Sequence, residues 1–308
     1  MTALGLYWQI LYNDIIPIFL AAGAGFLLGR RLQLDLKSLS RVAFYVFSPC
    51  LVYNSITHSD LGGLAFLQIA VVTLLAAVVV ALIAYLAGTA LRLERHTLAT
   101  LVVAATFGNA GNFGLAVNKL AFGEQALARA LIYYVFSSLA VYTLGVAIAA
   151  SGRRPLRDVV RHGLVLPTTI AVAIALVLRL TGLVTPQPLD VSIGLLSQAA
   201  IPLMLVLLGL QIASIREWPR AQFGLMVLAA ISQLIVAPLV ALALAVAVGL
   251  TGIALKAIVL EAAMPAAVIT TVLAVEYDLD TTLVSGTVLV STLLSPLTLT
   301  PLIALLQR

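Results

Sequence analysis

Two apolar segments of the chain are each interrupted at their middle, and the residues at the interruptions could bind ions. The first segment, Thr97–Asn118, is broken by the sequence GNAGN at 108–112. The second, Lys256–Glu276, is broken at Met264-Pro265 and carries the acid Glu261 one turn before the break. An acid inside an apolar segment is a functional-site hypothesis by default. Interrupted helices at corresponding places in two halves of a chain are typical of the binding site of a secondary transporter.

The residue types at these two breaks suit a carboxylate ligand. A helix that breaks in lipid frees main-chain N–H and C=O groups, and the amides at the start of a half-helix attract an anion. We therefore expect the amides near Asn112–Phe113 and Ala266–Ala267 to cradle a carboxylate, with the side-chain amides of Asn109 and Asn112 donating as well. The alternative is that both asparagines only satisfy the broken main chain. The expected substrate-binding residues are Asn109, Gly111, Asn112, Phe113, Met264, Pro265, Ala266, Tyr53 and Asn54.

Glu261 is the candidate for coupling to an ion. A carboxyl group at membrane depth can take up and release a proton, or it can hold Na⁺ together with main-chain carbonyls of a break. The alternative is a packing carboxylate that pairs with a nearby threonine or stays neutral. We expect H⁺ or Na⁺ at Glu261 and no other cofactor. The three histidines, which fall at helix ends and assemble no metal or nucleophilic site, are His58, His96 and His162.

Other polar residues of the apolar segments are weaker candidates for a functional role. Tyr53 and Asn54 could line the cavity, whereas Tyr53 could equally anchor its helix at the membrane interface. Three glutamines are expected to bridge helices rather than touch substrate. They are Gln198, Gln211 and Gln233.

The composition indicates an integral membrane protein. Of the 308 residues 62% are hydrophobic and 9% are charged, whereas soluble domains carry about 25% charged residues. Apolar runs of about 20 residues, the length of a spanning helix, recur along the chain, and the alternating segments of a β-barrel are missing from the sequence. The net charge of +5 comes from short loops between these runs and does not indicate nucleic-acid binding.

The pattern predicts an all-α fold of ten transmembrane helices. Their ranges are 8–29, 38–57, 63–91, 97–119, 124–150, 163–183, 190–213, 219–249, 253–276 and 280–306. Asp14 is expected to cap the first helix and Asp280 the last. Twelve of the 17 Lys and Arg residues fall on one side of this arrangement and five on the other. The positive-inside rule then predicts a multi-pass protein of the cell inner (plasma) membrane with both termini outside.

The two halves of the chain show signs of an internal repeat. Helix-disrupting residues recur at spacings of 150, 153 and 156. The pairs are Pro17 and Pro167, Pro49 and Pro202, and Asn109 and Pro265. We expect a first five-helix repeat at 1–150, a cytoplasmic linker at 151–162 and a second repeat at 163–308. An odd number of crossings inverts the second copy, and inverted repeats are common in secondary transporters.

Five stretches of the chain resemble the auxin efflux carrier family in its bacterial form. They read NDIIPIFLAAGAGFLLGRR, SRVAFYVFSPCLVYNSI, FGNAGNFGLAV, EAAMPAAV and VEYDLD…STLLSPLTLTPLI. The resemblance covers essentially the whole chain. Its most specific parts are the Asn/Gly cluster at 109–114 and the Met264-Pro265 break followed by Tyr277-Asp278. The family includes plant auxin exporters and bacterial permeases described as malonate or malate transporters.

The resemblance implies a specific architecture and mechanism. Members have ten helices in two inverted five-helix repeats, a fold similar to that of bile-acid sodium symporters. Helices 4 and 9 would be broken and cross at the substrate site, helices 1, 2, 6 and 7 would form a scaffold, and the remaining helices a moving core. Glu261, three residues before Met264, is similar to the acid of the sodium site in those symporters. A homodimer through the scaffold helices is left open.

The chain departs from the plant exporters at its first break, where glycines stand in place of a proline. They are Gly108, Gly111 and Gly114. This difference weakens the inference that auxin is the substrate. We expect a secondary active transporter of small organic anions, either carboxylates such as malonate and malate or auxin-like acids, that works by alternating access in membrane lipid. The alternatives are a channel or a membrane-embedded enzyme, although an enzyme would need several convergent catalytic groups at depth.

Overall fold

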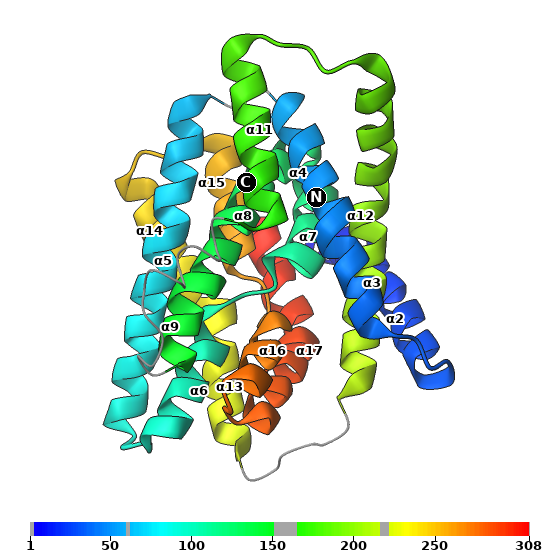
Figure 1. Cartoon of the computed structure of the whole chain (residues 1–308). Helices are drawn as coiled ribbons and strands as arrows, with labels where there is room; N and C mark the ends of the chain where they lie inside the picture. The colour runs from blue at the N-terminus through cyan, green and yellow to red at the C-terminus, as the bar shows by residue number, and fades with distance from the viewer. Residues whose placement is uncertain (1–2, 60–61, 151–164, 216–221, 308) are drawn as a thin grey trace.

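The computed structural model describes residues 3–59, 62–150, 165–215 and 222–307, and these residues are helical with short connections (Figure 1). The helices are α1 (Ala3–Ile10), α2 (Ile16–Arg31), α3 (Leu36–Val42), α4 (Ser48–Thr57), α5 (Gly63–Ala90), α6 (Arg95–Thr106), α7 (Leu115–Phe122), α8 (Glu124–Ala140), α9 (Val146–Ala149), α11 (Pro167–Thr181), α12 (Gln187–Ser214), α13 (Phe223–Ile231), α14 (Ala237–Ala247), α15 (Gly252–Ala262), α16 (Ile269–Glu276) and α17 (Thr281–Leu306). The described part of the chain contains no β-strand, only an isolated bridge. The predicted linker at 151–162 lies outside the described residues.

Several of these helices continue into one another through single π-helical turns. The turns are η1 (Leu11–Ile15), η2 (Ala43–Phe47), η3 (Ala110–Gly114), η4 (Val141–Gly145) and η6 (Ser232–Val236). A π-helical turn adds a residue to one turn of an α-helix and is frequent at functional sites. Here η1, η2, η4 and η6 shift the side chains of apolar helices without ending those helices, whereas η3 begins the second half of a helix that is interrupted after α6.

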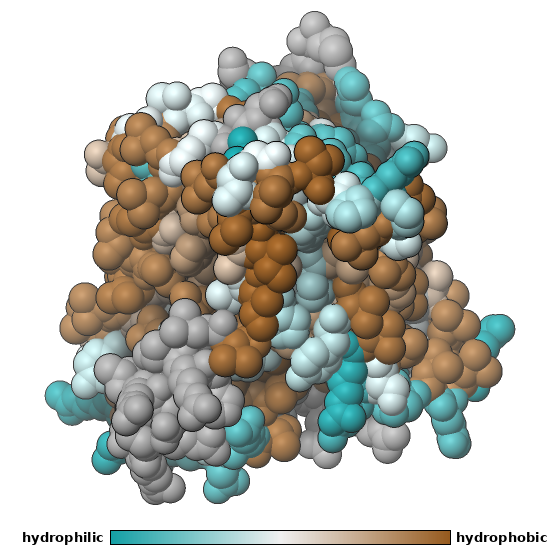
Figure 2. All heavy atoms as spheres, turned by 45° about the horizontal axis from the view of Figure 1, so that its top comes forward, coloured by the Kyte–Doolittle hydropathy of each residue, from teal (hydrophilic) through white to brown (hydrophobic). Residues whose placement is uncertain are grey.

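Six helices of the described residues are long and apolar enough to cross a membrane. Their ranges are Leu4–Arg31, Gly63–Ala90, Glu124–Ala149, Gln187–Ser214, Phe223–Ala247 and Thr281–Leu306. Figure 2 shows apolar side chains over the flanks of the molecule and hydrophilic side chains mainly toward its two ends. The prediction of an all-helical membrane protein is therefore confirmed at this level.

The first of these helices begins earlier than predicted. Its first turn includes Ala3, so Asp14 lies in the π-helical turn η1, within a continuous helical stretch rather than at its start. The prediction that Asp14 caps this helix is wrong, because the apolar residues that precede Asp14 extend the helix toward the N-terminus.

Asp280 caps α17 as predicted. Its Oδ1 accepts hydrogen bonds from the amides of Thr282 and Leu283, both at 3.0 Å. Its Oδ2 accepts a hydrogen bond of 2.7 Å from Gln222 Nε2. Partial burial raises the pKa of this carboxyl group, but the hydrogen bonds outweigh burial and hold the pKa below its usual value. The cap therefore also joins the start of α17 to the segment that leads into α13.

The helices pack in two groups. In the first helix group, α2 packs on α12, and α4 packs on both α11 and α12. In the second helix group, α5 contacts α6, α8 and α14, while α15 contacts α8 and α14 and α17 contacts α13. In Figure 1, α2 and α12 of the first helix group lie on the right, and α5, α6 and α14 of the second helix group lie on the left.

Small residues allow the closest packing in the first helix group. A Cβ atom on Gly209 of α12 would lie 1.8 Å from the carbonyl oxygen of Ala22 on α2, and one on Gly25 would lie 2.1 Å from the carbonyl oxygen of Val206. Only glycine fits at such a distance between two main chains, as is common where membrane helices cross. These contacts fix α2 and α12 against each other as a firm unit beside the second group.

Candidate functional site

The two predicted breaks meet in the structure. Gly108 and Ala266 form an antiparallel bridge. The amide of Asn109 donates to the carbonyl of Pro265 at 2.7 Å, and the amide of Ala267 donates to the carbonyl of Phe107 at 2.8 Å. The interruption between α6 and α7 therefore pairs with the interruption between α15 and α16, although the two lie in different halves of the sequence.

Glycine at position 108 follows from this close pairing. A Cβ atom on Gly108 would lie 3.1 Å from both the carbonyl oxygen of Met264 and Gln233 Oε1. Met264 is itself fully buried. A larger residue at 108 would press on the opposite break, so the glycine permits two main chains to run side by side inside the helical core.

The main-chain amides predicted to cradle a carboxylate have partners within the protein. The Asn112 amide donates to Asn109 Oδ1 at 3.2 Å, and the Phe113 amide donates to the Asn109 carbonyl at 3.3 Å. The Ala266 amide donates to Ser291 Oγ at 3.0 Å, and the Ala267 amide bonds to the other break. Within the described breaks these four amides are not free, because three of them bond to the breaks themselves and the Ala266 amide bonds to Ser291 of α17.

The side chain of Asn109 keeps an unused donor at the crossing. Asn109 is 6% exposed, and its Nδ2 is buried with no hydrogen-bond partner. Because Asn109 Oδ1 accepts from the Asn112 amide, the orientation of the side-chain amide is fixed and Nδ2 is the unpaired atom. A buried donor without a partner costs about 1–3 kcal/mol, so its natural complement is an acceptor on a ligand.

The other residues predicted for the first break connect the two helix groups. Asn112 Nδ2 donates to Gln211 Oε1 of α12 across a long 3.4 Å. Phe113 is fully buried and packs edge-on against Phe19 of α2, with ring centroids 5.8 Å apart. A Cβ atom on Gly111 would lie 2.7 Å from the ring of Tyr134 on α8. The first break thus touches the first helix group directly.

Glu261 is fully buried beside the second half of the first broken helix. Its Oε1 accepts a 3.0 Å hydrogen bond from Asn118 Nδ2, which also donates to the Gly114 carbonyl at 3.2 Å. Two acceptors around Nδ2 fix the orientation of this amide as well. Glu261 Oε2 and Asn118 Oδ1 are buried and have no partner. A Cβ atom on Gly114 would lie 2.2 Å from Glu261 Oε2.

Asn118 was not predicted as a functional residue. Sequence reasoning placed it only at the end of an apolar segment, and the bond to Glu261 joins residues 143 positions apart. The available signal was an amide side chain nine residues after Asn109, directly after the apolar run at 115–117.

The unpaired atoms around the crossing differ in chemistry on its two sides. At Asn109 the free atom is a donor, which suits an anion or a carbonyl oxygen. At Glu261 and Asn118 the free atoms are oxygens, which suit a proton or a hard cation with oxygen ligands such as Na⁺. The described residues hold no cluster of three or more His, Cys, Asp or Glu that could bind a metal ion.

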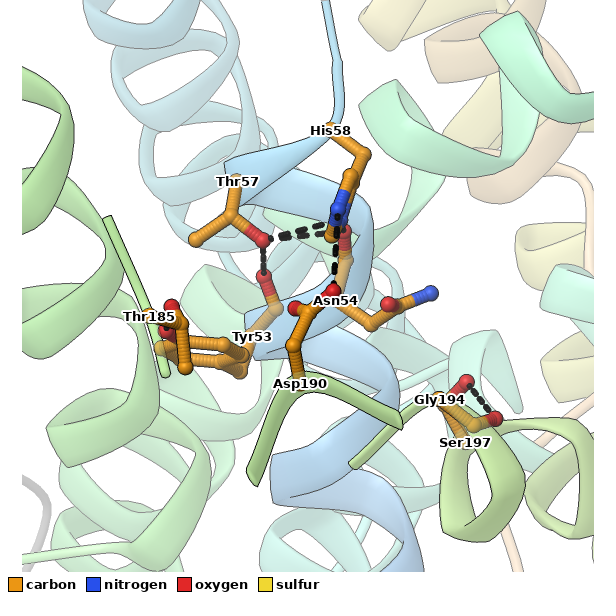
Figure 3. A network of polar contacts seen from close by, with 8 residues as sticks. All are labelled: Tyr53, Asn54, Thr57, His58, Thr185, Asp190, Gly194 and Ser197. Atoms are coloured by element: carbon orange, nitrogen blue, oxygen red, sulfur yellow. Dashed lines mark hydrogen bonds and ion pairs between the residues drawn. The ribbon is translucent and has the colours of Figure 1, made fainter. Parts of the chain in front are cut away.

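Tyr53 and Asn54 lie in a separate polar network near the end of α4 (Figure 3). Tyr53 Oη and Thr185 Oγ1 are 2.5 Å apart, which ties α4 to the segment before α12. His58 Nδ1 contacts the Asn54 carbonyl at 2.9 Å, and His58 Nε2 lies 3.8 Å from Asp190 Oδ2.

The side chain of Asn54 points away from these contacts (Figure 3). It lines an open surface depression of about 410 Å³ with residues of α4 and α12. The described lining of this depression includes no residue of either break. The structure therefore brings together the predicted residues of the two breaks, whereas Asn54 lies at this surface depression and Tyr53 is buried in an apolar cluster with Leu131 and Val172.

A family model described as "Membrane transport protein" matches the chain over residues 10–157 and 151–303. An "Uncharacterized transporter" from Methanothermobacter thermautotrophicus is 31% identical over 262 residues, 85% of this chain and 86% of that protein. An uncharacterized transporter from Methanocaldococcus jannaschii is 28% identical over 269 residues, 84% of this chain and 86% of that protein. A protein from Rhizobium meliloti named "Putative malonate transporter" is 31% identical over 232 residues, 70% of each chain.

Proposed function

This chain belongs to the membrane transport protein family, and we propose that it is a secondary transporter of small organic carboxylates. The resemblance to auxin efflux carriers that the sequence shows is confirmed by this membership. The observation that carries the proposal is the pairing of two broken helices around a buried, unpaired amide donor of Asn109. Irregular main chain at membrane depth persists where it is buried or lines a cavity, and in transporters it marks the substrate site.

The carboxylate binds to side-chain amides at the first break. Asn109 Nδ2 supplies a donor that no protein atom uses, and the long bond from Asn112 Nδ2 to Gln211 can be exchanged for one to substrate. Hydrogen bonds to a charged group are stronger than bonds between neutral groups. The start of the half-helix that continues into α7 adds a favourable dipole for a negative charge.

Transport proceeds by movement of the second helix group against the first. The tight glycine contacts between α2 and α12 suit a rigid scaffold. By contrast, the first break meets this scaffold through one long hydrogen bond, from Asn112, and through apolar packing, in which Phe113 lies in one cluster with residues of α2 and α12 such as Ala22 and Leu208. These contacts can break and re-form, so the crossing would face each side of the membrane in turn.

The chain has two inverted five-helix repeats, with the broken helices α6–α7 and α15–α16 as equivalent elements. The pairing of the two breaks across a local antiparallel bridge supports this arrangement, since equivalent elements of an inverted repeat meet at the pseudo-symmetry axis. Ten crossings would put both termini on one side of the membrane, and the twelve Lys and Arg residues on the opposite side support the outer side for the termini.

Glu261 couples the cycle to an ion, and a proton is the ion that we favour. Its unpaired Oε2 and the adjacent Asn118 Oδ1 provide two acceptor oxygens. A proton needs one of them, whereas Na⁺ would require further oxygen ligands from the breaks. A proton can therefore bind to this carboxyl group without any rearrangement of the main chain at the breaks, which Na⁺ would need for its further ligands.

A small dicarboxylate is the substrate class that the comparisons favour. The Rhizobium meliloti relative carries malonate in its name. Membership of a transporter family and the isolated position of Glu261 argue against a membrane-embedded enzyme, which needs convergent catalytic groups. The alternative of a channel is distinguished by electrical recording, because a channel would show single-channel currents and a secondary transporter would not.

Thermal unfolding of the purified protein tests the substrate class. We expect malonate or malate to raise the midpoint of unfolding and an arylacetate to leave it unchanged, because a ligand at 100 times its Kd stabilises by about 2.7 kcal/mol. The screen is run across pH, with and without Na⁺. A shift with the arylacetate alone would contradict the assignment.

Asn109→Asp is expected to remove the malonate-induced shift. The variant keeps Oδ1, which caps the Asn112 amide, and replaces the unpaired donor by an oxygen that repels a carboxylate. Loss of a hydrogen bond to a charged group corresponds to an affinity about tenfold lower or more. Asn13→Asp, at an exposed position, is the matched control. A full shift in Asn109→Asp would show that substrate binds elsewhere.

A further inference from the structure

Asn118 joins the two broken helices at a point beside their breaks. It lies on α7, the second half of the first broken helix, and Glu261 lies on α15, the first half of the second. Its Nδ2 donates to Glu261 Oε1 at 3.0 Å and to the Gly114 carbonyl at 3.2 Å, and both side chains are fully buried. Because two acceptors occupy Nδ2, the amide has one orientation and Oδ1 is the atom left unpaired.

The hydrogen bonds continue from Asn118 to the proposed substrate donor. The Gly114 amide donates at 3.0 Å to the carbonyl of Asn109, the residue whose side-chain Nδ2 is the unpaired donor at the crossing. Gly114 thus meets Asn118 through its carbonyl and Asn109 through its amide. Three hydrogen bonds therefore lead from the Glu261 carboxyl group to Asn109, and all of them lie inside the protein, where such bonds hold their partners firmly.

One proton can satisfy both oxygens that Glu261 and Asn118 leave unpaired. Glu261 Oε2 and Asn118 Oδ1 are buried acceptors without a partner, and they belong to a carboxyl group and an amide that the 3.0 Å bond already joins. A proton on Oε2 turns this oxygen into a donor, for which Oδ1 is an acceptor. A carboxylic acid and an amide can then share two hydrogen bonds, whereas the carboxylate and the amide share one. Protonation of Glu261 therefore changes how Asn118 is held.

Glu261 is the buried acid among the elements packed around it. The elements that pack against α15 are α5, α7, α8, α14, α17 and η3. Tyr133 on α8 is close enough to interact with the charge of Glu261. The other charged or titratable residues of these elements and of α15 are Tyr85, Lys119, Glu124, Arg129, Tyr134 and Lys256. Glu124 is exposed and pairs with Lys119 at 2.8 Å, and tyrosine, lysine and arginine side chains titrate at about pH 10 or above.

We propose that Asn118 is the positioning residue that transmits protonation of Glu261 to the substrate donor of Asn109. The proton binds Glu261 Oε2, which donates to Asn118 Oδ1 while Nδ2 keeps its bond to Oε1. Closing this acid–amide pair moves Nδ2 against the Gly114 carbonyl, and Gly114 passes the movement to Asn109. Protonation then changes the affinity for the carboxylate, and the bound carboxylate changes the affinity for the proton by the same factor. The inference rests on the proposed proton-coupled transport and names the residue that joins its two sites.

The pH dependence of malonate binding to the purified protein tests this coupling. Calorimetry gives the Kd from about pH 5 to about pH 9, a range in which buried glutamates titrate. Glu261→Gln can keep both bonds of the closed pair at every pH, because its amide nitrogen donates to Asn118 Oδ1. We expect the wild type to match Glu261→Gln at the acid end and to differ from it about tenfold at the alkaline end, a typical coupling between two sites. Protonation of malonate itself is common to both proteins and cancels.

Asn118→Leu is expected to remove this difference. In the Asn118→Leu background, Glu261 and Glu261→Gln should bind malonate within about twofold of each other at every pH, the residual expected of uncoupled sites. Asn118→Ser is measured alongside, in case leucine prevents folding, because one hydroxyl proton cannot serve both Glu261 and the Gly114 carbonyl. Asn13→Leu, at an exposed position, is the matched control and should keep the wild-type pH dependence.

Infrared difference spectra between the acid and alkaline ends of this range test the acid–amide pair without malonate. A carboxyl C=O band that appears on acidification and is missing in Glu261→Gln belongs to Glu261. We expect this band at higher frequency in Asn118→Leu, because the C=O group loses the donor Nδ2 and the O–H group loses the acceptor Oδ1. An unshifted band would overturn the pair.

The binding data distinguish failure of the coupling from failure of the transporter. If the tenfold difference persists in Asn118→Leu, the charge of Glu261 acts on the substrate directly, Asn118 is not the coupling residue and the transporter stands. If the wild type and Glu261→Gln bind malonate equally at every pH, proton coupling fails together with the role of Asn118. If the wild type does not bind malonate, the proposed substrate fails, and the infrared band alone decides whether Asn118 and Glu261 form the pair.

Discussion

Replacing Glu261 by glutamine is expected to abolish malonate accumulation driven by an ion gradient while malonate exchange continues. Glutamine retains the size of the side chain and an oxygen that can accept from Asn118 Nδ2. It cannot take up a proton, and it lacks the negative charge that would hold Na⁺. The ion gradient then has no group on which to act, whereas the amides of the first break still bind substrate.

The measurement for Glu261→Gln is labelled malonate uptake in proteoliposomes under an imposed pH or Na⁺ gradient. The accumulation ratio should fall to that of vesicles without a gradient. The rate of exchange should remain within about an order of magnitude of the wild-type rate, because the substitution removes the ionisable group and leaves the substrate-binding amides in place. Glu124→Gln is the matched control, since Glu124 is an exposed residue paired with Lys119 at 2.8 Å. Full gradient-driven uptake by Glu261→Gln would eliminate this residue as the coupling group.

Gly114→Ala is expected to destabilise the protein and to disturb the Glu261 site at the same time. The added Cβ atom would lie 2.2 Å from Oε2, 2.7 Å from Cδ and 2.8 Å from Oε1 of Glu261. No real Cβ atom approaches so closely, and the fully buried carboxylate has little room to withdraw. Overpacking of this kind costs typically about 1–3 kcal/mol.

A double-mutant cycle shows whether a side chain at position 114 clashes directly with the side chain of Glu261. The cost of Gly114→Ala, measured by thermal unfolding in detergent, should be largely removed in a Glu261→Ala background, because the atoms that clash are gone. Contacting residues show coupling energies of about 0.5–3 kcal/mol in such cycles. Gly224→Ala is the control, because a Cβ atom there meets nothing within 4 Å. An equal cost of Gly114→Ala in both backgrounds would refute the direct contact.

The sequence alone was sufficient for the helical membrane fold and for the location of both breaks. Composition excludes a soluble domain, and Gly108 and Pro265 interrupt apolar segments that would otherwise be continuous helices. The pairing of the two breaks was expected only through the resemblance to a known family. Periodicity and composition carry no information on which segments cross, since that depends on packing between distant parts of the chain.

The polar bonds of the site could not be predicted from the sequence. The amides near Asn112 and Ala266 were expected to be free, yet Asn109 and Ser291 satisfy them in the structure. A polar residue in an apolar helix is visible in the sequence, but its partner depends on rotamers and on helix rotation. For the same reason Asn118 was missed.

Malonate counterflow tests the central claim most directly. Proteoliposomes that contain the purified protein are loaded with unlabelled malonate and diluted into a trace of labelled malonate. Alternating access to a carboxylate site predicts a transient accumulation of label above the outside concentration, which Asn109→Asp should lose and Asn13→Asp should retain. Simple equilibration of the label without an overshoot, or no uptake at all, would contradict a malonate transporter whose substrate binds where the two broken helices cross.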